Sequence, residues 1–447
     1  MKKKNVQVQP ELDGTPQVKT KQPIVWGNVA FLTLLPLATV VAVPWYVLTR
    51  GVTWVEIAAC LGMWVVTGLS VTAGYHRLFT HRAYEAPAAV RAVFAVIGAA
   101  AYENSVISWA AAHRYHHRHV DSDDDPYNAQ KGFWHSHMGW IMVEGPKHDD
   151  TDNVPDLWKD PILRWQHRHP ILIGTVFNLA TTVALGLLTG RMLGMFVFAL
   201  LLRLVLTQHF TFLINSAAHM WGSQPYSSAH SARDNWVLSF FTFGEGYHNY
   251  HHSFQADYRN GPRLYNWDPS KWLIWVLARL GFASNLRRSP LDVTLGRMFE
   301  HARTSFEEHL RAAGETIDGW QASAGEAMDA WQASAGETID GWQASARSHT
   351  TAAGAAFREL LDSAPPEALR AHILAAEKRC EEALQDLKAA RTSLQALITQ
   401  GASLVARRRL RRQLREAQRA VRAALEHWQA LGRAYLEQVL AAPSPTA

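Results

Sequence analysis

Four long apolar segments constrain the fold of this 447-residue chain more than any other feature. They run over residues 24–48, 52–73, 170–188 and 192–214. A helix needs roughly 20 apolar residues to cross a bilayer, and an open sheet edge cannot satisfy its backbone there. Links of three residues, at 49–51 and 189–191, join the first pair and the last pair. We therefore expect an all-α integral membrane protein with four transmembrane helices in two hairpins.

Basic residues set the expected orientation of these spans. Lys2–Lys4, Lys19 and Lys21 precede the first span, and an even number of spans returns the chain to its starting side. The positive-inside rule then places both termini and the long loops in the cytoplasm. The polar first 23 residues predict a disordered cytosolic leader rather than a cleaved signal peptide. Of two shorter apolar segments, 88–101 predicts a re-entrant or interfacial helix and 271–283 predicts an interfacial helix.

Eight histidines lie in three clusters that flank the spans on their expected cytoplasmic side. They are His76 and His81 in H-R-L-F-T-H, His113, His116 and His117 in H-R-Y-H-H, and His248, His251 and His252 in H-N-Y-H-H. Residues at i, i+3 and i+4 share one helix face. Neutral imidazoles gathered beside a membrane need a partner, and nitrogen ligands suit iron, zinc or copper. Eight ligands exceed the needs of one ion, so the pattern predicts a dinuclear metal site.

A ninth histidine follows directly after the fourth span. In N-S-A-A-H, Asn215 and His219 are four residues apart and would share a helix face. Polar residues at the end of an apolar span are functional candidates, with His219 as a ligand and Asn215 on a metal-bound water. A histidine-rich metal pair at a membrane surface suggests activation of dioxygen for attack on a lipid-like substrate.

The linking segments carry further motifs: D-P-Y-N at 125–128, G-F-W-H-S-H-M-G-W at 132–140 and D-Y-R-N-G at 257–261. Together with the histidine boxes they resemble the acyl-CoA desaturase family, the stearoyl-CoA type of membrane fatty acid desaturase. The resemblance covers about residues 24–290. It implies a cytoplasmic helical cap over the four spans, and it implies two iron ions bound by the nine histidines with Asn215 acting through water.

The resemblance also implies an activity. Members of the family remove two hydrogens from a saturated acyl chain, most often at the Δ9 position, with dioxygen and two electrons. Trp109 and Thr211 fall where members line the bent substrate tunnel, although both are also ordinary packing residues. The expected location is a bacterial inner membrane, with the active site facing the cytoplasm.

Two departures from the family pattern concern the acyl carrier. Ala111 and Ala112 stand where animal members have Arg-Asp, and Glu144-Gly145 stands where they have a basic pair. Acyl-CoA is the expected substrate, and an acyl carrier protein or a membrane glycerolipid remains an alternative. No heme-binding H-P-G-G motif is present in the sequence, so we expect a separate ferredoxin, rubredoxin or cytochrome-type donor with its reductase. We expect no nucleic-acid partner.

Two other functions fit part of the pattern. A membrane di-iron hydroxylase would use the same kind of ligands but would release an alcohol instead of an alkene. A non-catalytic membrane scaffold would hold structural zinc and present its helical tail to partners.

The composition changes after Pro290, where the sequence becomes rich in alanine, arginine and glutamate. We expect a linker over 291–366, with three 11-residue repeats in 313–345, and an amphipathic helical hairpin or coiled coil over 367–441. Eight arginines fall between Arg407 and Arg422. The tail is expected to self-associate, or to dock an acidic electron donor or anionic lipid through these arginines.

Overall fold

The structure, a computed structural model, describes residues 22–145, 150–312, 319–323, 326, 364–401 and 403–441. These residues form helices and connecting loops, and their only β pairing consists of isolated bridges. The chain divides into two compact units. The first comprises Met1–Val65 and Ala100–Ser216, and the second comprises Val66–Ala99 and Ala217–Ala447.

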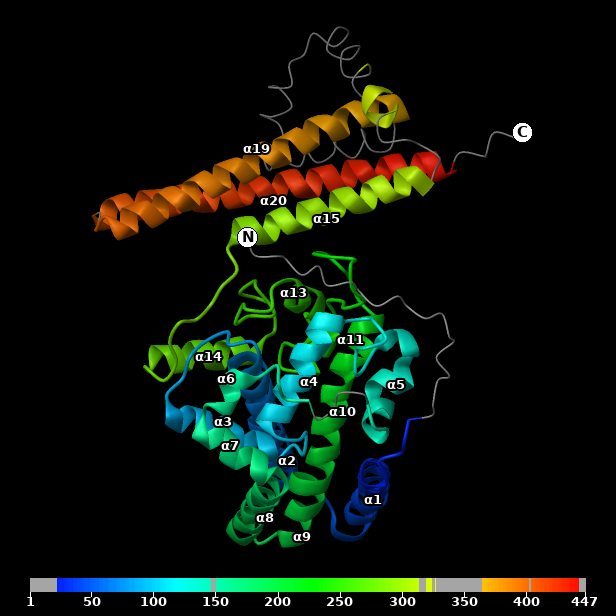
Figure 1. The fold of residues 1–447 in the computed structure, drawn as a ribbon, viewed down its shortest axis with the longest axis vertical. Coiled ribbons are helices and arrows are strands. Elements are labelled where there is room, and N and C mark those ends of the chain that lie inside the picture. The colour runs from blue at the N-terminus through cyan, green and yellow to red at the C-terminus, as the bar shows by residue number, and fades with distance from the viewer. Residues whose placement is uncertain are drawn as a thin grey trace, which may run out of the picture. The chain divides into compact units, whose positions relative to one another are not determined.

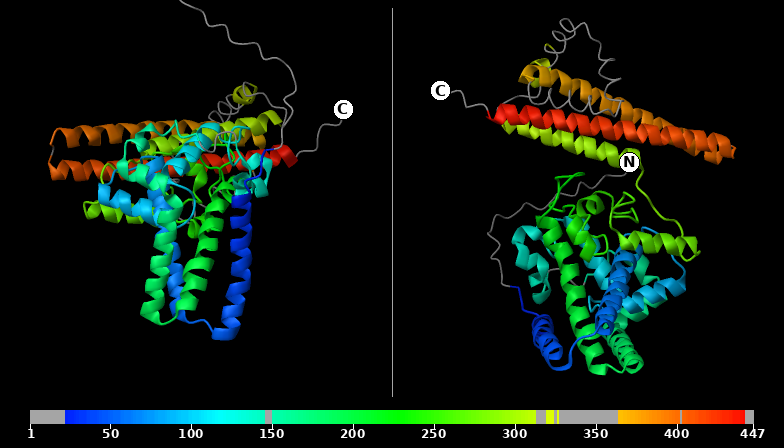
Figure 2. Two further views of the ribbon diagram at one scale, coloured as in Figure 1. Left: turned by 60° about the horizontal axis from the view of Figure 1, so that its bottom comes forward. Right: turned by 180° about the vertical axis from the view of Figure 1, so that it is seen from behind.

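Most of the membrane helices belong to the first unit (Figure 1). Its elements are α1 (Trp26–Arg50), the start of α2 (Trp54–Leu69), α4 (Val106–His119), η2 (Ala129–Lys131), α5 (Phe133–His137), η3 (Gly139–Met142), α6 (Pro155–Trp158), α7 (Pro161–Arg168), α8 (Pro170–Thr189), α9 (Met192–Gly194), η4 (Met195–Leu202) and α10 (Arg203–Asn215). Figure 2 shows α1, α8 and α10, in blue, teal and green, as long neighbouring helices, and both α1 and α8 contact η4.

The second unit holds the remaining elements. They are the end of α2, η1 (Ser70–Thr80), α3 (Ala88–Ala99), α11 (Ala217–Met220), α12 (Trp236–Phe241), α13 (His248–Ser253), α14 (Pro269–Arg279), α15 (Leu291–Ala312), α19 (Pro366–Thr399) and α20 (Leu404–Ala441).

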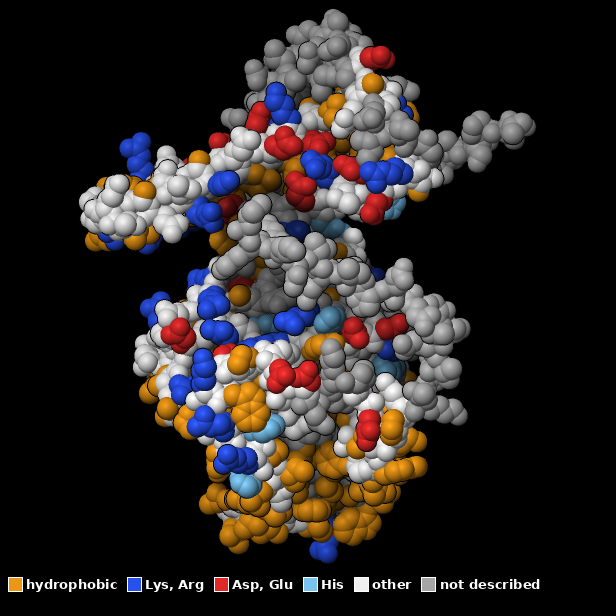
Figure 3. All heavy atoms as spheres, in the orientation of Figure 1, with side chains coloured by type: hydrophobic (Ala, Val, Ile, Leu, Met, Phe, Trp, Pro, Cys, Tyr) orange, Lys and Arg blue, Asp and Glu red, His pale blue; other side chains and the backbone are white. Residues whose placement is uncertain are grey.

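Among the residues that the structure describes, four helical stretches are long and apolar enough to cross a membrane, which confirms the predicted fold class. They are Trp26–Arg50, Trp54–Thr80, Pro170–Thr189 and Met192–Met220. The second and fourth run past their predicted ends at residues 73 and 214, because η1 and α11 continue the helical path into polar sequence. The extensions carry His76, Asn215 and His219. Apolar side chains cover the surface of the spans visible in Figure 3.

An ion pair between Arg191 and the buried Glu56 joins the two helical hairpins within the first unit. Thr53 donates its backbone N–H to the Glu56 carboxylate at 3.0 Å, as in a capping box at the start of α2. Arg191, in the link between α8 and α9, also donates to Glu56, and the Tyr46 hydroxyl donates at 2.8 Å. Arg191 also donates to the carbonyl of Gly51 at 3.1 Å, so these contacts hold the two links together.

Two glycines allow η1 and α3 to pack closely in the second unit. A Cβ added at Gly74 of η1 would lie 2.8 Å from Cβ of Phe94, and one added at Gly98 of α3 would lie 2.3 Å from the Tyr75 ring. Each glycine therefore accepts an aromatic side chain of the other helix. The Tyr75 hydroxyl also donates to the carbonyl of Ala95 at 3.3 Å.

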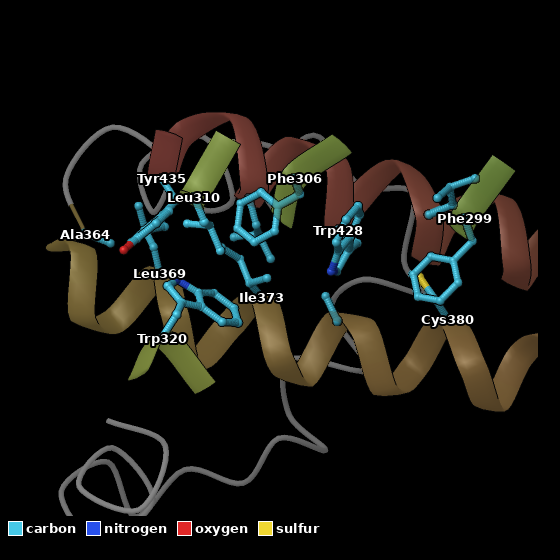
Figure 4. Packing of buried hydrophobic residues seen from close by; sticks show 13 residues of the cluster. Phe299, Phe306, Leu310, Trp320, Ala364, Leu369, Ile373, Cys380, Trp428 and Tyr435 are labelled. Atoms are coloured by element: carbon cyan, nitrogen blue, oxygen red, sulfur yellow. The ribbon is translucent and has the colours of Figure 1, made fainter. Parts of the chain in front are cut away.

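The three long C-terminal helices form an apolar core of their own. α15 packs against both α19 and α20, and Phe299, Phe306, Trp428 and Tyr435 meet between them (Figure 4). α15 lies in the segment expected to be a linker, where apolar residues at helical spacing give it one buried face. The repeats lie largely outside the described residues, and Trp320 packs edge-on against Phe306 with ring centroids 5.5 Å apart.

Candidate metal centre

An unusual backbone places His76 and His81 together. In an α-helix, residues five apart point about 140° away from each other. In η1 the His81 N–H instead donates to the His76 carbonyl at 3.0 Å, an i→i+5 bond, and the ring centroids lie 4.7 Å apart. Such π-helical segments often mark functional sites. The four-residue gap in H-x4-H therefore suits this backbone, which brings both imidazoles to one face.

His251 of α13 joins these two histidines in the second unit. Its Nε2 lies 3.0 Å from Nε2 of His76, and its ring centroid lies 4.4 Å from that of His76 and 4.6 Å from that of His81. One ligand nitrogen from each of the three histidines lies within 4.8 Å of the others. Two of the predicted histidine boxes thus contribute to one cluster.

A second cluster in the same unit contains His219 of α11 and two residues of α13, His248 and His252. Nε2 of His248 lies 3.0 Å from Nε2 of His219 and 3.1 Å from Nε2 of His252. All three rings are buried. α13 supplies both clusters because His251 and His252 project from adjacent positions on one short helix.

The remaining three histidines project from α4 in the first unit. Ser105 caps this helix, and its Oγ accepts the Ser108 N–H at 3.1 Å. Nε2 of His113 and Nε2 of His117 are 3.0 Å apart, one helical turn from each other. The His116 ring centroid lies 5.9 Å from that of His113 and 5.5 Å from that of His117. The His116 side chain therefore projects from α4 in a different direction from those of His113 and His117.

The outer nitrogens of the α4 histidines have fixed partners. Nδ1 of His116 lies 2.9 Å from Oδ1 of Asp125, and Nδ1 of His113 lies 3.0 Å from the Tyr127 hydroxyl. The Tyr127 ring also stacks on His116 at a centroid distance of 4.3 Å. An acceptor at Nδ1 favours the tautomer with its lone pair on Nε2, which is the arrangement typical of metal-binding histidines.

The same arrangement occurs in the second unit. Nδ1 of His76 lies 2.8 Å from Oε2 of Glu245, and Nδ1 of His219 lies 2.7 Å from the Ser231 hydroxyl. His76, His113 and His219 therefore turn Nδ1 toward a protein partner and Nε2 toward another imidazole. Nitrogen lone pairs that converge in this way suit a divalent cation.

Glu245 belongs to a buried network of charged groups. Arg77, whose exposed fraction is 1%, donates to Glu245 at 2.8 Å and pairs with Asp268 at 2.9 Å. Asn260 donates to the other Glu245 oxygen at 2.5 Å. Burial raises the pKa of Glu245, but Arg77 and His76 outweigh it and hold that pKa below its ordinary value. The carboxylate is therefore ionised at neutral pH and can orient the His76 ring.

The two predicted tunnel residues share a neighbour in the first unit. The Trp109 ring stacks on His113 at a centroid distance of 4.8 Å, and its Nε1 donates to Glu103 at 3.3 Å. Thr211 donates its hydroxyl to the Thr207 carbonyl at 3.0 Å. Burial raises the pKa of Glu103 to about 7, although the neighbouring Thr211 hydroxyl and the hydrogen bond from Trp109 both lower it. A substrate-binding role for Trp109 and Thr211 remains a prediction.

Sequence reasoning missed the groups that hold the histidines in place. Arg77, Glu245 and Asp268 lie far apart along the chain, and Glu103 stands alone in a short loop. The sequence did offer one indication of these groups: Arg77 lies at the end of an apolar span, and a charge there usually has a buried partner. Asn215 is the half-buried last residue of α10, and its predicted role on a metal-bound water remains a prediction.

Comparison with known proteins gives several relatives. A model of the fatty acid desaturase family matches residues 52–272. A probable acyl-CoA desaturase of Schizosaccharomyces pombe is 44% identical over 226 residues, which are 50% of this chain and 47% of that protein. This chain thus spans about half the length of the yeast relative.

Two further relatives match over most of their own length. Stearoyl-CoA desaturase 5 of Bos taurus is 35% identical over 277 residues, 60% of this chain and 81% of that protein. The sn-1 stearoyl-lipid 9-desaturase of Anabaena variabilis is 32% identical over 272 residues, 60% of this chain and 96% of that protein.

Proposed function

The chain belongs to the fatty acid desaturase family, and from this premise we propose that it is a membrane acyl desaturase. It introduces a cis double bond at Δ9 of a saturated acyl chain, using dioxygen and two electrons. The observation that carries this proposal is that histidine Nε2 atoms lie in pairs 3.0–3.1 Å apart in both units: His76 with His251, His113 with His117, and His248 with His219 and His252. The names of the bovine and Anabaena relatives support a stearoyl substrate.

We propose that two iron ions occupy this centre. The nine histidines bind them: His76, His81, His113, His116, His117, His219, His248, His251 and His252. Asn215 acts through a water molecule. When bound, the irons supply the capacity to activate dioxygen and to remove hydrogen from an unactivated carbon.

The donor set supports iron over structural zinc. Imidazole nitrogen is a ligand that suits iron. Two tetrahedral zinc ions would take eight ligands, whereas the three boxes and His219 offer nine histidines.

The chain's own side chains position and shield the reaction. Asp125, Tyr127, Glu245 and Ser231 fix the tautomers of their histidines, as carboxylates and hydroxyls behind metal ligands generally do. Trp109 covers one face of His113. We propose that Trp109 and Thr211 hold the acyl chain beside the centre and exclude water from it.

Acyl-CoA is the proposed substrate, with a glycerolipid or an acyl carrier protein as the alternative. The bovine relative is named for a CoA ester and the Anabaena relative for a lipid. Ala111 is 1% exposed and its carbonyl accepts from Asn153 at 2.9 Å, so this position offers no surface to a carrier. CoA would therefore have to be bound through other residues.

The proposed location is a bacterial inner membrane, with both termini and the metal centre on the cytoplasmic side. The even number of candidate spans and the basic first 21 residues support this orientation. The two electrons come from a separate ferredoxin, rubredoxin or cytochrome-type protein and its reductase.

Expression in a host that lacks its own desaturases tests the proposal. We expect unsaturated fatty acids with a Δ9 cis bond, and a His116→Ala variant that is membrane-inserted but forms none. His119→Ala on the same helix is the matched control, since His119 belongs to neither cluster and packs on Tyr115. Hydroxylated fatty acids in place of alkenes would show a hydroxylase, and product from His116→Ala would refute the ligand assignment.

The same cells can identify the acyl carrier. A pulse of labelled saturated fatty acid is followed by separation of the acyl-CoA, acyl carrier protein and glycerolipid pools. Label that becomes unsaturated first in acyl-CoA supports the proposed substrate. Label that becomes unsaturated first in intact glycerolipid would contradict it.

A further inference from the structure

The C-terminal helix α20 has a charge distribution that the proposed reaction does not use. Its 38 residues contain nine arginines and three glutamates. At about 100° per residue, seven of the arginines fall within a sector of roughly 100°, and five of these lie in the first 16 residues of the helix. They are Arg408, Arg411, Arg412, Arg415 and Arg419, and all five are exposed. This arginine face is about 17 Å long.

The opposite side of α20 is already occupied. Leu414, Ala417 and Val421 pack against α15 and α19 in a core that includes Leu295 and Leu387. Bundle packing therefore turns the arginine face outward. Among its five arginines, the described residues provide an acidic partner only to Arg412, through Glu416 at 2.9 Å. The bundle leaves most of this positive charge uncompensated.

Aliphatic side chains are exposed at the end of the hairpin where the arginine face begins. Ile398 at the end of α19 is 47% exposed, and Leu404 and Val405 at the start of α20 are 71% and 76% exposed. Leu404 falls in the same angular sector as Arg408 and Arg411. We call Ile398, Leu404 and Val405 the hairpin tip. Apolar and basic side chains lie together at this end of the hairpin in Figure 3.

We propose that the arginine face and the hairpin tip bind the surface of an anionic phospholipid membrane. Arginines side by side with exposed aliphatic residues are typical of segments that rest at the headgroup layer, with the charges at the phosphates and the apolar groups below them. A second copy of the chain does not fit this face, because five arginines would meet five others. The four candidate spans keep the chain in a membrane, which raises the local lipid concentration.

Fluorescence of the full-length chain tests this proposal. A Gln400→Cys variant carries an environment-sensitive fluorophore beside the hairpin tip, since Gln400 is exposed and the native Cys60 and Cys380 are buried. The protein is reconstituted in vesicles of phosphatidylcholine alone, or with about 30 mol % phosphatidylglycerol, an anionic lipid. We expect a blue shift and quenching by nitroxide-labelled lipid only in the anionic vesicles. Both effects should disappear at about 0.5 M salt.

Two quadruple variants separate charge from fold. Replacing Arg408, Arg411, Arg415 and Arg419 by glutamine should abolish the blue shift, because each charge near such a surface changes binding roughly fivefold at low salt. Replacing the same residues by lysine should retain it. Circular dichroism checks that both variants keep the helices.

Three results would overturn the proposal. One is an identical emission spectrum in neutral and anionic vesicles. Another is a blue shift that survives the glutamine substitutions. The third is an unshifted probe that responds only to an added acidic ferredoxin, because this would identify a protein as the partner of the arginine face.

Discussion

At the scale of single residues, the centre depends on groups that never touch the substrate. Glu245 contacts Nδ1 of His76 and pairs with buried Arg77. A Glu245→Gln variant keeps the shape but loses the charge, so His76 is held less firmly. We expect metal affinity to fall by about 10- to 100-fold, measured by titration with a chelator.

Glu85→Gln is the matched control for that substitution. Glu85 is exposed and accepts a hydrogen bond from Asn285 at 2.7 Å, so its neutralisation should leave metal affinity unchanged. Unaltered affinity in Glu245→Gln, with a normal melting temperature, would show that Glu245 has no role in holding His76.

Glu103 gives a prediction about pH. Burial raises its pKa to about 7, from 4.5 in an exposed carboxyl. Between these values the folded chain holds a proton that the unfolded chain has lost, so this residue makes the protein less stable as pH rises through the window. Glu103→Gln removes the effect. The free energy of unfolding of the variant, relative to that of wild type, should rise by about 2 kcal/mol between pH 5 and pH 8.

Thermal unfolding in detergent at several pH values measures this difference. If the melting temperatures of Glu103→Gln and wild type differ by the same amount across pH 5–8, the Glu103 carboxyl is already ionised in the folded chain. Glu85→Gln again serves as the control, and its offset should not depend on pH.

At the scale of elements, the sequence predicted the four spans and the segments that carry the histidines, but not the π-helical backbone of η1. Apolar length is a local property, so the spans could be placed within a few residues at most of their ends. The i→i+5 hydrogen bonds of η1 depend on its contacts with α3 and α14, which no local pattern encodes. The Nδ1 partner of His76 is likewise 169 residues away in sequence.

The packing of η1 on α3 yields a prediction at this scale. A leucine at Gly98 would drive its Cβ into the Tyr75 ring, next to His76. We expect Gly98→Leu to lower the free energy of unfolding by about 1–3 kcal/mol and to reduce bound metal. Gly62→Leu on α2 is the control, since nothing lies within 4 Å of a Cβ there. Equal melting temperatures and metal contents in the two variants would contradict the packing argument.

At the scale of the whole molecule, the C-terminal helices form a core separate from the matched family region. Their apolar clusters draw on residues after 290, and the family match ends at residue 272. The alignment with the Anabaena relative takes in 96% of that protein but only 60% of this chain. We therefore expect a chain that ends at residue 290 to insert, bind metal and retain its turnover when an electron donor is supplied.

Turnover of that shortened chain, compared with the full chain at equal metal content, checks the expectation. A truncation after residue 312 is the contrasting variant, since it keeps α15 but exposes the face that Phe299 and Phe306 bury, and it should aggregate. Loss of activity in the chain that ends at 290, despite normal metal content, would assign α15–α20 a part in catalysis.

We propose that nine histidines hold two irons. Iron and zinc are therefore counted per chain in active, full-length protein purified from iron-replete cells, beside His116→Ala purified in the same way. We expect two iron atoms per chain, with turnover proportional to iron, and at most one iron in the variant. A single metal ion per active chain, or active protein that holds zinc in place of iron, would contradict it.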